Sequence, residues 1–279
     1  MTAGSGSASI PSLAFDSAGS GPPLVLIHGL ASSRRCWDLV VDDLARDFTV
    51  YAVDLPGHGD SDPIPGQAET PATEMARAIG CFLDERDIDR AHLVGNSLGG
   101  WTALEAAADG RALSVTALCP AGLWEPIHEP LGAIQFNRRA AVATKRFIPS
   151  IMRIGPVRRT LMRTGAERAG AVPYRVAVDA AYAQADARGF EQAHDGALHR
   201  RFDRAEAIPA EVPVTIAFGD NDRLLPAPRF QQRDLAPSHV RWEVLWNCGH
   251  APMWDVPTVT TTLVRETASR GASAPGAGA

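Results

Sequence analysis

Lysine is nearly absent from this chain of 279 residues, because Lys145 is the only lysine among its 27 basic residues. Cysteine is scarce too, and no C-x-x-C pair or zinc-finger spacing occurs, which excludes a zinc finger and a disulfide-stapled protein. We expect buried, reduced thiols at the four cysteines, Cys36, Cys81, Cys119 and Cys248. No apolar run approaches the ~20 residues that a membrane helix needs. Because the first residues also lack the pattern of a secretory signal, we expect a cytoplasmic protein without a membrane span.

An excess of positive charge is also missing. The 27 basic and 32 acidic residues give a net charge of −5, which argues against nucleic acid as a partner. With 45% hydrophobic and 21% charged residues, the composition is that of an ordinary folded protein rather than a disordered one. The length fits one large domain or two small ones, and the sequence carries no signal for a particular oligomeric state.

Short apolar runs alternate with helical patterns through most of the chain. Strands are expected at residues 24–27, 48–53, 91–94, 115–118, 214–218 and 242–246, and helices at 37–45, 73–84, 102–108, 229–235 and 259–268. Strands that alternate with helices are typical of parallel sheets with helices on both faces. The sequence therefore predicts an α/β fold with a mostly parallel, doubly wound sheet.

The alternation stops between residues 123 and 207. In this stretch the apolar residues take helical spacing, and several prolines divide it into short helices. We therefore expect a discontinuous core, made of residues 1–122 and 208–279, with a helical insertion at 123–207. The Gly/Ala/Ser-rich ends, residues 1–9 and 270–279, are expected to be poorly ordered.

The sequence G-N-S-L-G-G at residues 95–100 lies between an expected strand and an expected helix. A serine on such a sharp strand-to-helix turn requires small residues two positions before and two after it, and Gly95 and Gly99 meet this requirement. The turn also puts Ser97 at a helix N-terminus, where the amide of Leu98 favours a developing oxyanion. Ser97 is therefore the candidate nucleophile.

A serine nucleophile needs a base and a group that orients the base. His250 follows the strand at 242–246 and is the candidate base. Asp220 and Asp222 follow the strand at 214–218, and Asp222 is the better candidate acid because the turn carries it farther over the sheet edge, whereas Asp220 would brace the loop. His194 and His199 are five residues apart, which does not match the spacing of a metal-ligand pair, so no metal site is expected.

These motifs resemble those of the α/β-hydrolase family over almost the whole chain outside the insertion. His28-Gly29 resembles the oxyanion loop of that family, residues 54–61 resemble its D-x-P-G-x-G-x-S loop, and Gly249-His250 with Asp255 and Pro257 resembles its catalytic-histidine segment. The resemblance implies oxyanion amides at Leu30 and Leu98, a helical cap at 123–207, and catalysis without a cofactor.

The same resemblance leaves several activities open. Ser97 favours a serine hydrolase that cleaves a small-molecule carboxylic ester, because relatives that open epoxides carry aspartate at this position. Asn96 is frequent in hydrolases that cleave carbon–carbon bonds in ring-fission diketones, but those typically have tryptophan where this chain has Ala251. Thioesters and lactones are further alternatives, and a receptor or signalling protein that retains the three residues is the alternative from another class.

The insertion has an unusual charge. Residues 138–168 hold nine basic residues and one acidic residue, Glu167. A solvated face is the ordinary meaning of such a run, and an anionic substrate or an acidic partner is the alternative. Apolar residues between these charges are candidates for a pocket-facing side of the cap: Ile148, Ile151, Met152, Ile154, Leu161 and Met162. Trp124 and Met253 are the candidate substrate-binding residues.

Overall fold

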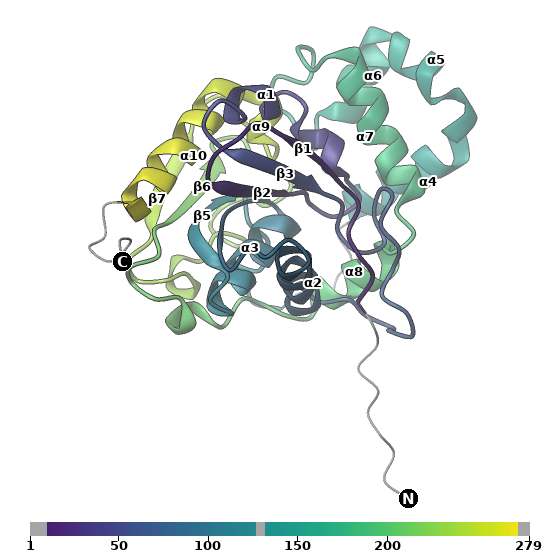
Figure 1. Ribbon diagram of the computed structural model, residues 1–279. Helices are drawn as coiled ribbons and strands as arrows, with labels where there is room; N and C mark the ends of the chain where they lie inside the picture. The colour runs from purple at the N-terminus through teal and green to yellow at the C-terminus, as the bar shows by residue number, and fades with distance from the viewer. Residues whose placement is uncertain (1–9, 127–131, 273–279) are drawn as a thin grey trace, which may run out of the picture.

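A seven-stranded sheet runs through the computed structural model, which describes residues 10–126 and 132–272. The strand order is β1-β3-β2-β4-β5-β6-β7. The strands are β1 (Phe15–Ala18), β2 (Pro23–Ile27), β3 (Thr49–Val53), β4 (Ala91–Asn96), β5 (Ala112–Leu118), β6 (Val214–Gly219) and β7 (Arg241–Leu245). Only β1 pairs antiparallel with its neighbour among these strands. The predicted α/β fold with a mostly parallel sheet is therefore confirmed (Figure 1).

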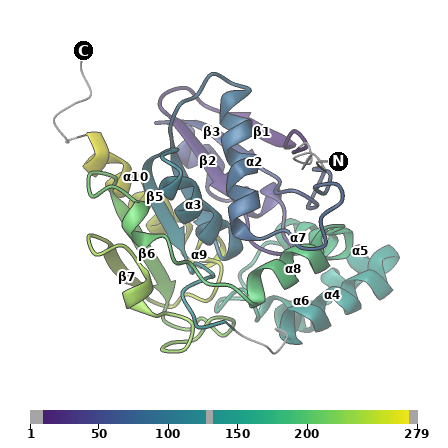
Figure 2. The same ribbon diagram turned by 90° about the horizontal axis from the view of Figure 1, so that it is seen from below.

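Helices cover both faces of this sheet (Figures 1 and 2). One face carries α2 (Ala72–Asp84) and α3 (Leu98–Ala108), and the other carries α1 (Val41–Leu44), α9 (Pro252–Asp255) and α10 (Pro257–Ala272). Successive side chains of a strand point to opposite faces. Accordingly, Val25 and Ile27 of β2 pack in the cluster under α2 and α3, whereas Leu24 and Leu26 pack with Leu263 of α10. This double burial explains the unbroken apolar run.

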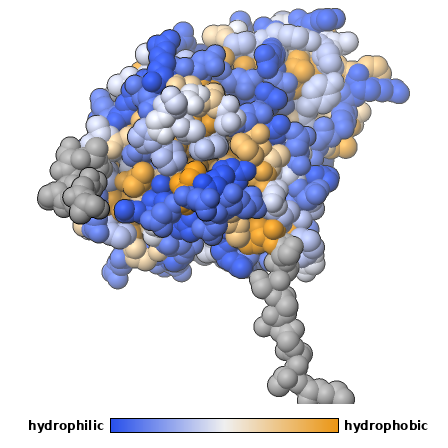
Figure 3. Space-filling model, viewed as in Figure 1, coloured by the Kyte–Doolittle hydropathy of each residue, from blue (hydrophilic) through white to orange (hydrophobic). Residues whose placement is uncertain are grey.

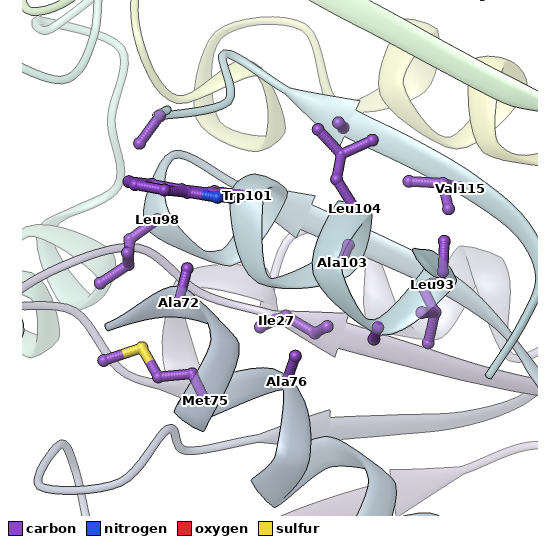
Figure 4. Close-up of a cluster of buried hydrophobic side chains, with 14 of the residues drawn as sticks. Ile27, Ala72, Met75, Ala76, Leu93, Leu98, Trp101, Ala103, Leu104 and Val115 are labelled. Atoms are coloured by element: carbon purple, nitrogen blue, oxygen red, sulfur yellow. The ribbon is translucent and has the colours of Figure 1, made fainter. Parts of the chain in front are cut away.

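Helix α3 is buried along almost its whole length. In Figure 4, Leu98 and Leu104 of α3 lie with Met75 of α2 and with Ile27 and Leu93 of the strands. Such packing anchors the helix whose first residue follows Ser97. The packing therefore holds the first turn of α3 in place at the carboxyl end of β4.

Four helices of the expected insertion pack together, and the last three of them share a hydrophobic cluster. They are α4 (Gly132–Thr144), α5 (Ile148–Arg153), α6 (Gly155–Met162) and α7 (Tyr174–Asp186). Ile148, Met152 and Ala177 belong to this cluster, and α7 contacts both α4 and α5. In contrast, α8 (Phe190–Leu198) contacts α2, and its Ala193 and Leu198 belong to the main core cluster. The helices of the insertion thus divide into an outer group of four and one that lies against the core (Figure 2).

A helix that crosses a bilayer must be long and apolar. Within the described residues, no helix combines the length and the apolar character that a bilayer span requires. On the face drawn in Figure 3, hydrophilic residues predominate and apolar residues form separate small patches.

Two expected helices are wrong in part. Over residues 37–45 the chain forms a 3-10 turn (Arg34–Trp37) and the short α1, because Val40 leaves the helical region with φ −125° while its side chain is fully buried. Over residues 229–235 only the turn Arg233–Leu235 is helical. There the N–H of Gln232 donates to the carbonyl of Leu123 at 3.0 Å, and is therefore not available to a local helix.

Two smaller expectations also need correction. Residues 270–272 belong to α10 rather than to a poorly ordered end, while residues 1–9 and 273–279 lie outside the described residues. Cys81 is exposed because it lies in the same row of α2 as the exposed Arg77 and Thr73, four and eight residues before it. The other three cysteines are buried, and all four are free.

Candidate active site

Ser97 lies on a strained turn between β4 and α3, with φ 57° and ψ −119°. The turn is closed so tightly that a Cβ at Gly95 would lie 2.1 Å from the carbonyl oxygen of Gly99. A Cβ at Gly99 would lie 2.1 Å from the carbonyl oxygen of Ile27 in β2. Both positions therefore require glycine, because a side chain there would collide with a carbonyl oxygen. This agrees with the need for small residues two positions before and after Ser97. Backbone strain at a single serine is typical of functional sites.

His250 and Asp222 form a buried pair. Nδ1 of His250 lies 2.8 Å from Oδ2 of Asp222, and both residues are 6% exposed. The other carboxylate oxygen of Asp222 accepts hydrogen bonds from the N–H groups of Leu224 and Leu225, at 2.9 and 2.8 Å. Because a carboxylate only accepts hydrogen bonds, Nδ1 carries a proton, and Nε2 is the ring atom that can accept another.

The environment keeps Asp222 ionised. Burial by itself raises the pKa of this carboxyl, but the charge and hydrogen bond of His250 and the amides of Leu225 and Leu224 outweigh burial. The pKa of Asp222 therefore lies below its ordinary value. Asp220, by contrast, is exposed and accepts a hydrogen bond from the N–H of Cys248 at 3.0 Å. Its contact is with the loop that precedes His250 and not with the imidazole.

Ser97 and His250 line one cavity of about 150 Å³. Nε2 of His250 is buried and has no hydrogen-bond partner within the described residues. An unpartnered buried acceptor in the same cavity as a serine can receive a proton. The backbone of Gly29 lies against Ser97, since a Cβ at position 29 would be 3.0 Å from the serine Cβ.

Two side chains hold the segments of the site together. The side-chain amide of Asn96 donates to the carbonyl oxygens of Leu118 at 3.1 Å and His250 at 2.9 Å. The carboxylate of Asp255 accepts hydrogen bonds of 2.8 Å from the N–H groups of Gly249, Glu167 and Arg168. Asn96 thus connects the serine turn to the histidine loop, and Asp255 connects that loop to the segment after α6.

The four candidate binding residues fall around two neighbouring hollows. Leu30 lines both the main cavity and a smaller hollow of about 30 Å³, and Ser97 borders the two. Met253 lines the main cavity, whereas Leu98 and Trp124 line the smaller hollow. Leu98 is also the first residue of α3, where a helix N–H has no partner within the helix.

The outer helices supply most of the apolar wall of the main cavity. Five of the six apolar residues proposed for the pocket-facing side line it: Ile148, Ile151, Met152, Leu161 and Met162. The expectation for Ile154 is wrong, because this residue ends α5 and is 54% exposed. Asn137, Thr144 and Gln184 add polar groups from α4 and α7. Sequence reasoning missed these three, although their helical positions beside the apolar residues were a usable signal.

None of the nine basic residues between positions 138 and 168 is among the described residues that line the main cavity. Arg138 and Lys145 pair instead with Glu191 and Asp186. Apart from His250, the described lining carries no ionisable side chain other than the buried thiol of Cys36. The expectation that this charge faces a substrate anion therefore finds no contact within the cavity.

Cys119 lies beside the buried pair and was also missed. One ligand-type atom from each of Cys119, Asp222 and His250 lies within 4.8 Å of the others. A thiol binds a metal ion as the thiolate. Burial raises the pKa of the Cys119 thiol well above its ordinary value, and Asp222 and His250 already bond to each other. The group therefore fits a packed acid–base pair better than a metal site.

The sequence is similar to those of several known proteins. The model of a family described as "Alpha/beta hydrolase family" matches residues 24–261. The chain is 30% identical over 196 residues to the epoxide hydrolase EphH of Mycobacterium tuberculosis, a match that covers 65% of this chain and 87% of that protein. It is 38% identical over 112 residues to the dihydrolipoyllysine-residue acetyltransferase component of the acetoin cleaving system of Cupriavidus necator. That match covers 39% of this chain and spans only 29% of the relative.

A similar fold occurs among solved structures. A thermophilic esterase from Thermogutta terrifontis, solved with malate bound, matches with a TM-score of 0.71 and 23% sequence identity. The alignment covers 93% of each chain. At this identity the likeness shows the arrangement of the sheet and helices.

Proposed function

This chain belongs to the alpha/beta hydrolase family, and we propose that it is a serine hydrolase that cleaves a carboxylic ester of a small molecule through an acyl-enzyme intermediate. The observation that carries the proposal is the state of His250. Its Nδ1 is bonded to Asp222, while its buried Nε2 has no partner within the described residues and borders the same cavity as Ser97. A serine nucleophile needs a histidine base whose Nδ1 is held by a carboxylate and whose Nε2 can accept the serine proton.

In the first step, Nε2 of His250 takes the proton of Ser97 as the serine Oγ bonds to the ester carbonyl carbon. The electron pair of the carbonyl moves onto its oxygen, which the N–H groups of Leu98 and Leu30 stabilise. Asp222, ionised in this site, stabilises the imidazolium. The tetrahedral intermediate then expels the alcohol, which takes the proton from Nε2, and leaves Ser97 acylated.

In the second step, a water molecule replaces the alcohol. Nε2 of His250 removes a proton from this water, whose oxygen bonds to the acyl carbon. Collapse of the second tetrahedral intermediate returns the proton to Ser97 Oγ and releases the carboxylic acid. All of these steps use groups of the chain and water, and the proposal includes no cofactor.

The cavity favours a neutral and small substrate. Its walls are mainly apolar, and moving an unpaired charge into such surroundings is costly. We therefore assign an uncharged acyl group to the side formed by Ile148, Met152 and Met162. This side belongs to α5 and α6, and the four outer helices α4 to α7 are the proposed cap, within the insertion expected at 123–207.

The contacts of Asn96 bear on the carbon–carbon alternative. The residue that favoured this alternative uses its side-chain amide to hold Leu118 and His250. Asn96 therefore holds the main chain of the site in position, and its presence favours no particular substrate. Epoxide opening has less support still, because Ser97 occupies the nucleophile position. Relatives that open epoxides also use a pair of cap tyrosines to polarise the oxygen. Here the hydroxyl of Tyr174 donates to the carbonyl of Pro149, and neither Tyr174 nor Tyr182 is among the described residues that line the cavity.

Labelling with a fluorophosphonate probe tests the proposal. We expect one adduct on Ser97 in the folded protein, none in Ser97→Ala, and slow labelling in His250→Ala. An adduct with turnover of p-nitrophenyl acetate supports an ester hydrolase. An adduct without turnover of esters, thioesters or lactones would favour the receptor alternative, and absence of any adduct would sink the enzyme proposal.

A further inference from the structure

A further hollow, of about 360 Å³, lies outside the main cavity and the small hollow beside it. Four arginines line it together with Glu167 and the short segment 169–171, and they are Arg159, Arg163, Arg168 and Arg223. None of these residues lines the main cavity. The two spaces are separated by the same stretch of chain, because Leu161, Met162 and Gly165 face the main cavity. The hollow is thus a separate feature, lined by the proposed cap and by Arg223 of the core.

The charges in this hollow are poorly neutralised. Its only carboxylate among the described residues, Glu167, pairs with Arg223. Arg159 and Arg163 have no carboxylate partner in the part of the chain that the structure describes, and the guanidinium of Arg168 donates to the main-chain carbonyl of Asp255 at 3.3 Å. Guanidinium groups that gather in one concave place repel one another unless an anion joins them.

The hollow is also held in a fixed shape. The N–H groups of Glu167 and Arg168 donate to the buried carboxylate of Asp255. The guanidinium of Arg159 lies over Gly170, where a Cβ would come within 3.1 Å of its Nε. Arg223 reaches the same place from the other half of the chain. These contacts fix the main chain of the hollow, and the four arginine side chains that line it are exposed and open to an anion.

We propose that this hollow is a binding site for a phosphate group, as a diphosphate or a phosphate monoester. Guanidinium forks suit phosphate oxygens because each presents two parallel N–H donors. The concave shape and the volume admit a phosphate with a second group attached, which a flat acidic protein surface does not match. The site is independent of the proposed ester hydrolysis, because it shares no lining residue with the main cavity.

Calorimetric titration in a low-chloride buffer tests this site. Inorganic phosphate, diphosphate and phenyl phosphate are the probes, and Arg159→Gln/Arg163→Gln is the variant. The matched control is Arg139→Gln/Arg153→Gln, which removes the same charge from two exposed arginines of the same segment that do not line the hollow. We expect saturable binding, weakened about tenfold or more in the variant and less than about twofold in the control.

Thermal unfolding gives an independent readout, because a ligand that binds only the folded protein raises Tm. Diphosphate should raise the Tm of the wild type and of the control, but not that of the Arg159→Gln/Arg163→Gln variant. Phenyl phosphate that binds more tightly than inorganic phosphate would indicate a monoester as the natural source, and the reverse a free phosphate or diphosphate. Equal weakening in variant and control, no saturation, or binding of a poly-glutamate peptide in place of every phosphate probe would each overturn the proposal.

Discussion

The side-chain amide of Asn96 donates a hydrogen bond of 2.9 Å to the main-chain carbonyl of His250. The two residues are 154 positions apart in sequence, and the bond is buried. It joins the residue before the candidate nucleophile to the main chain of the candidate base. Their relative position is therefore set by a direct contact rather than only by the sheet.

Replacing Asn96 with alanine removes this contact. We expect kcat for p-nitrophenyl acetate to fall about tenfold or more with little change in KM, because a small misplacement of reacting groups lowers the rate of the chemical step. Thr102→Ala is the control, since Thr102 donates to Leu98 within α3 and does not touch the histidine loop. An equal loss in both variants would mean that general loosening of the turn is responsible.

The two aspartates after β6 should behave differently. Asp222→Asn is expected to lower kcat by about 10⁴, because the ring of His250 then loses the carboxylate that fixes its tautomer. Asp220→Asn keeps one acceptor for the N–H of Cys248, and its effect should stay within about threefold. A comparison of steady-state rates at pH 8 decides the matter. If Asp220→Asn is the more damaging change, the acid assignment is wrong.

Buried histidines should make the protein less stable in mild acid. Burial lowers the pKa of His58 to about 3 and that of His92 to about 4, from an ordinary 6.5. Between these values and 6.5 the unfolded chain binds protons that the folded protein does not, so stability is complete above pH 6.5 and is lost as the pH falls.

Urea unfolding between pH 7 and 4.5 measures this loss. Each such histidine contributes a slope of up to about 1.4 kcal/mol per pH unit. The His92→Gln variant should therefore show a smaller slope than the wild type, whatever its stability at pH 7. His199→Gln is the control, because it removes a histidine from an exposed position. Parallel curves for the wild type and His92→Gln would contradict this account.

Asp255 should be more important for stability than an ordinary surface acid. Asp255→Asn replaces one accepting oxygen by an NH₂ group that faces N–H donors, at a cost of about 2 kcal/mol. Asp84→Asn removes an ion pair with Arg111 in which Asp84 is 65% exposed, and should cost less than about 1 kcal/mol. Chemical unfolding of both variants measures the difference. Similar costs would show that the tie between the histidine loop and the segment after α6 is weak.

The size of the cavity should limit the acyl chain. Ala181 lines the cavity from α7, and Ala181→Leu fills part of its 150 Å³. We expect kcat/KM for p-nitrophenyl butanoate to fall at least about tenfold more than kcat/KM for the acetate. Ala143→Leu, at an exposed position of α4, is the control and should leave the ratio unchanged. An unchanged ratio in Ala181→Leu would move the acyl group to another part of the site.

Local motifs made part of this site predictable. The requirement for glycine at positions 95 and 99 follows from backbone sterics over a few residues, and the structure gives each of them a close contact. The sheet could be predicted equally well, because the apolar runs of β2 and β6 match strands that are buried on both faces. The catalytic roles of Ser97, Asp222 and His250, and the amides of Leu30 and Leu98, remain predictions, as does the extent of the cap.

Contacts between distant parts of the chain could not be predicted from the sequence. Nothing near Asp255 in sequence indicates that Glu167 and Arg168 will donate to it, since that depends on how the segment after α6 meets the core. For the same reason the apolar spacing of α5 predicted a pocket-facing side but misjudged Ile154, which lies where the helix ends. Tertiary pairing likewise overrode helix propensity at Gln232.

The order of the strands along the chain decides which residues of the site are synthesised first. Ser97 and its turn emerge from the ribosome with β1 to β5, whereas Asp222 and His250 follow β6 and β7, on the far side of the insertion. A growing chain therefore carries the serine turn before it carries a base. The pairing of β5 with β6 closes the long loop that holds α4 to α8. Because each doubling of such a loop adds only about 0.6 kcal/mol to its closure, the insertion can lengthen or shorten in evolution while the pairing that completes the site persists.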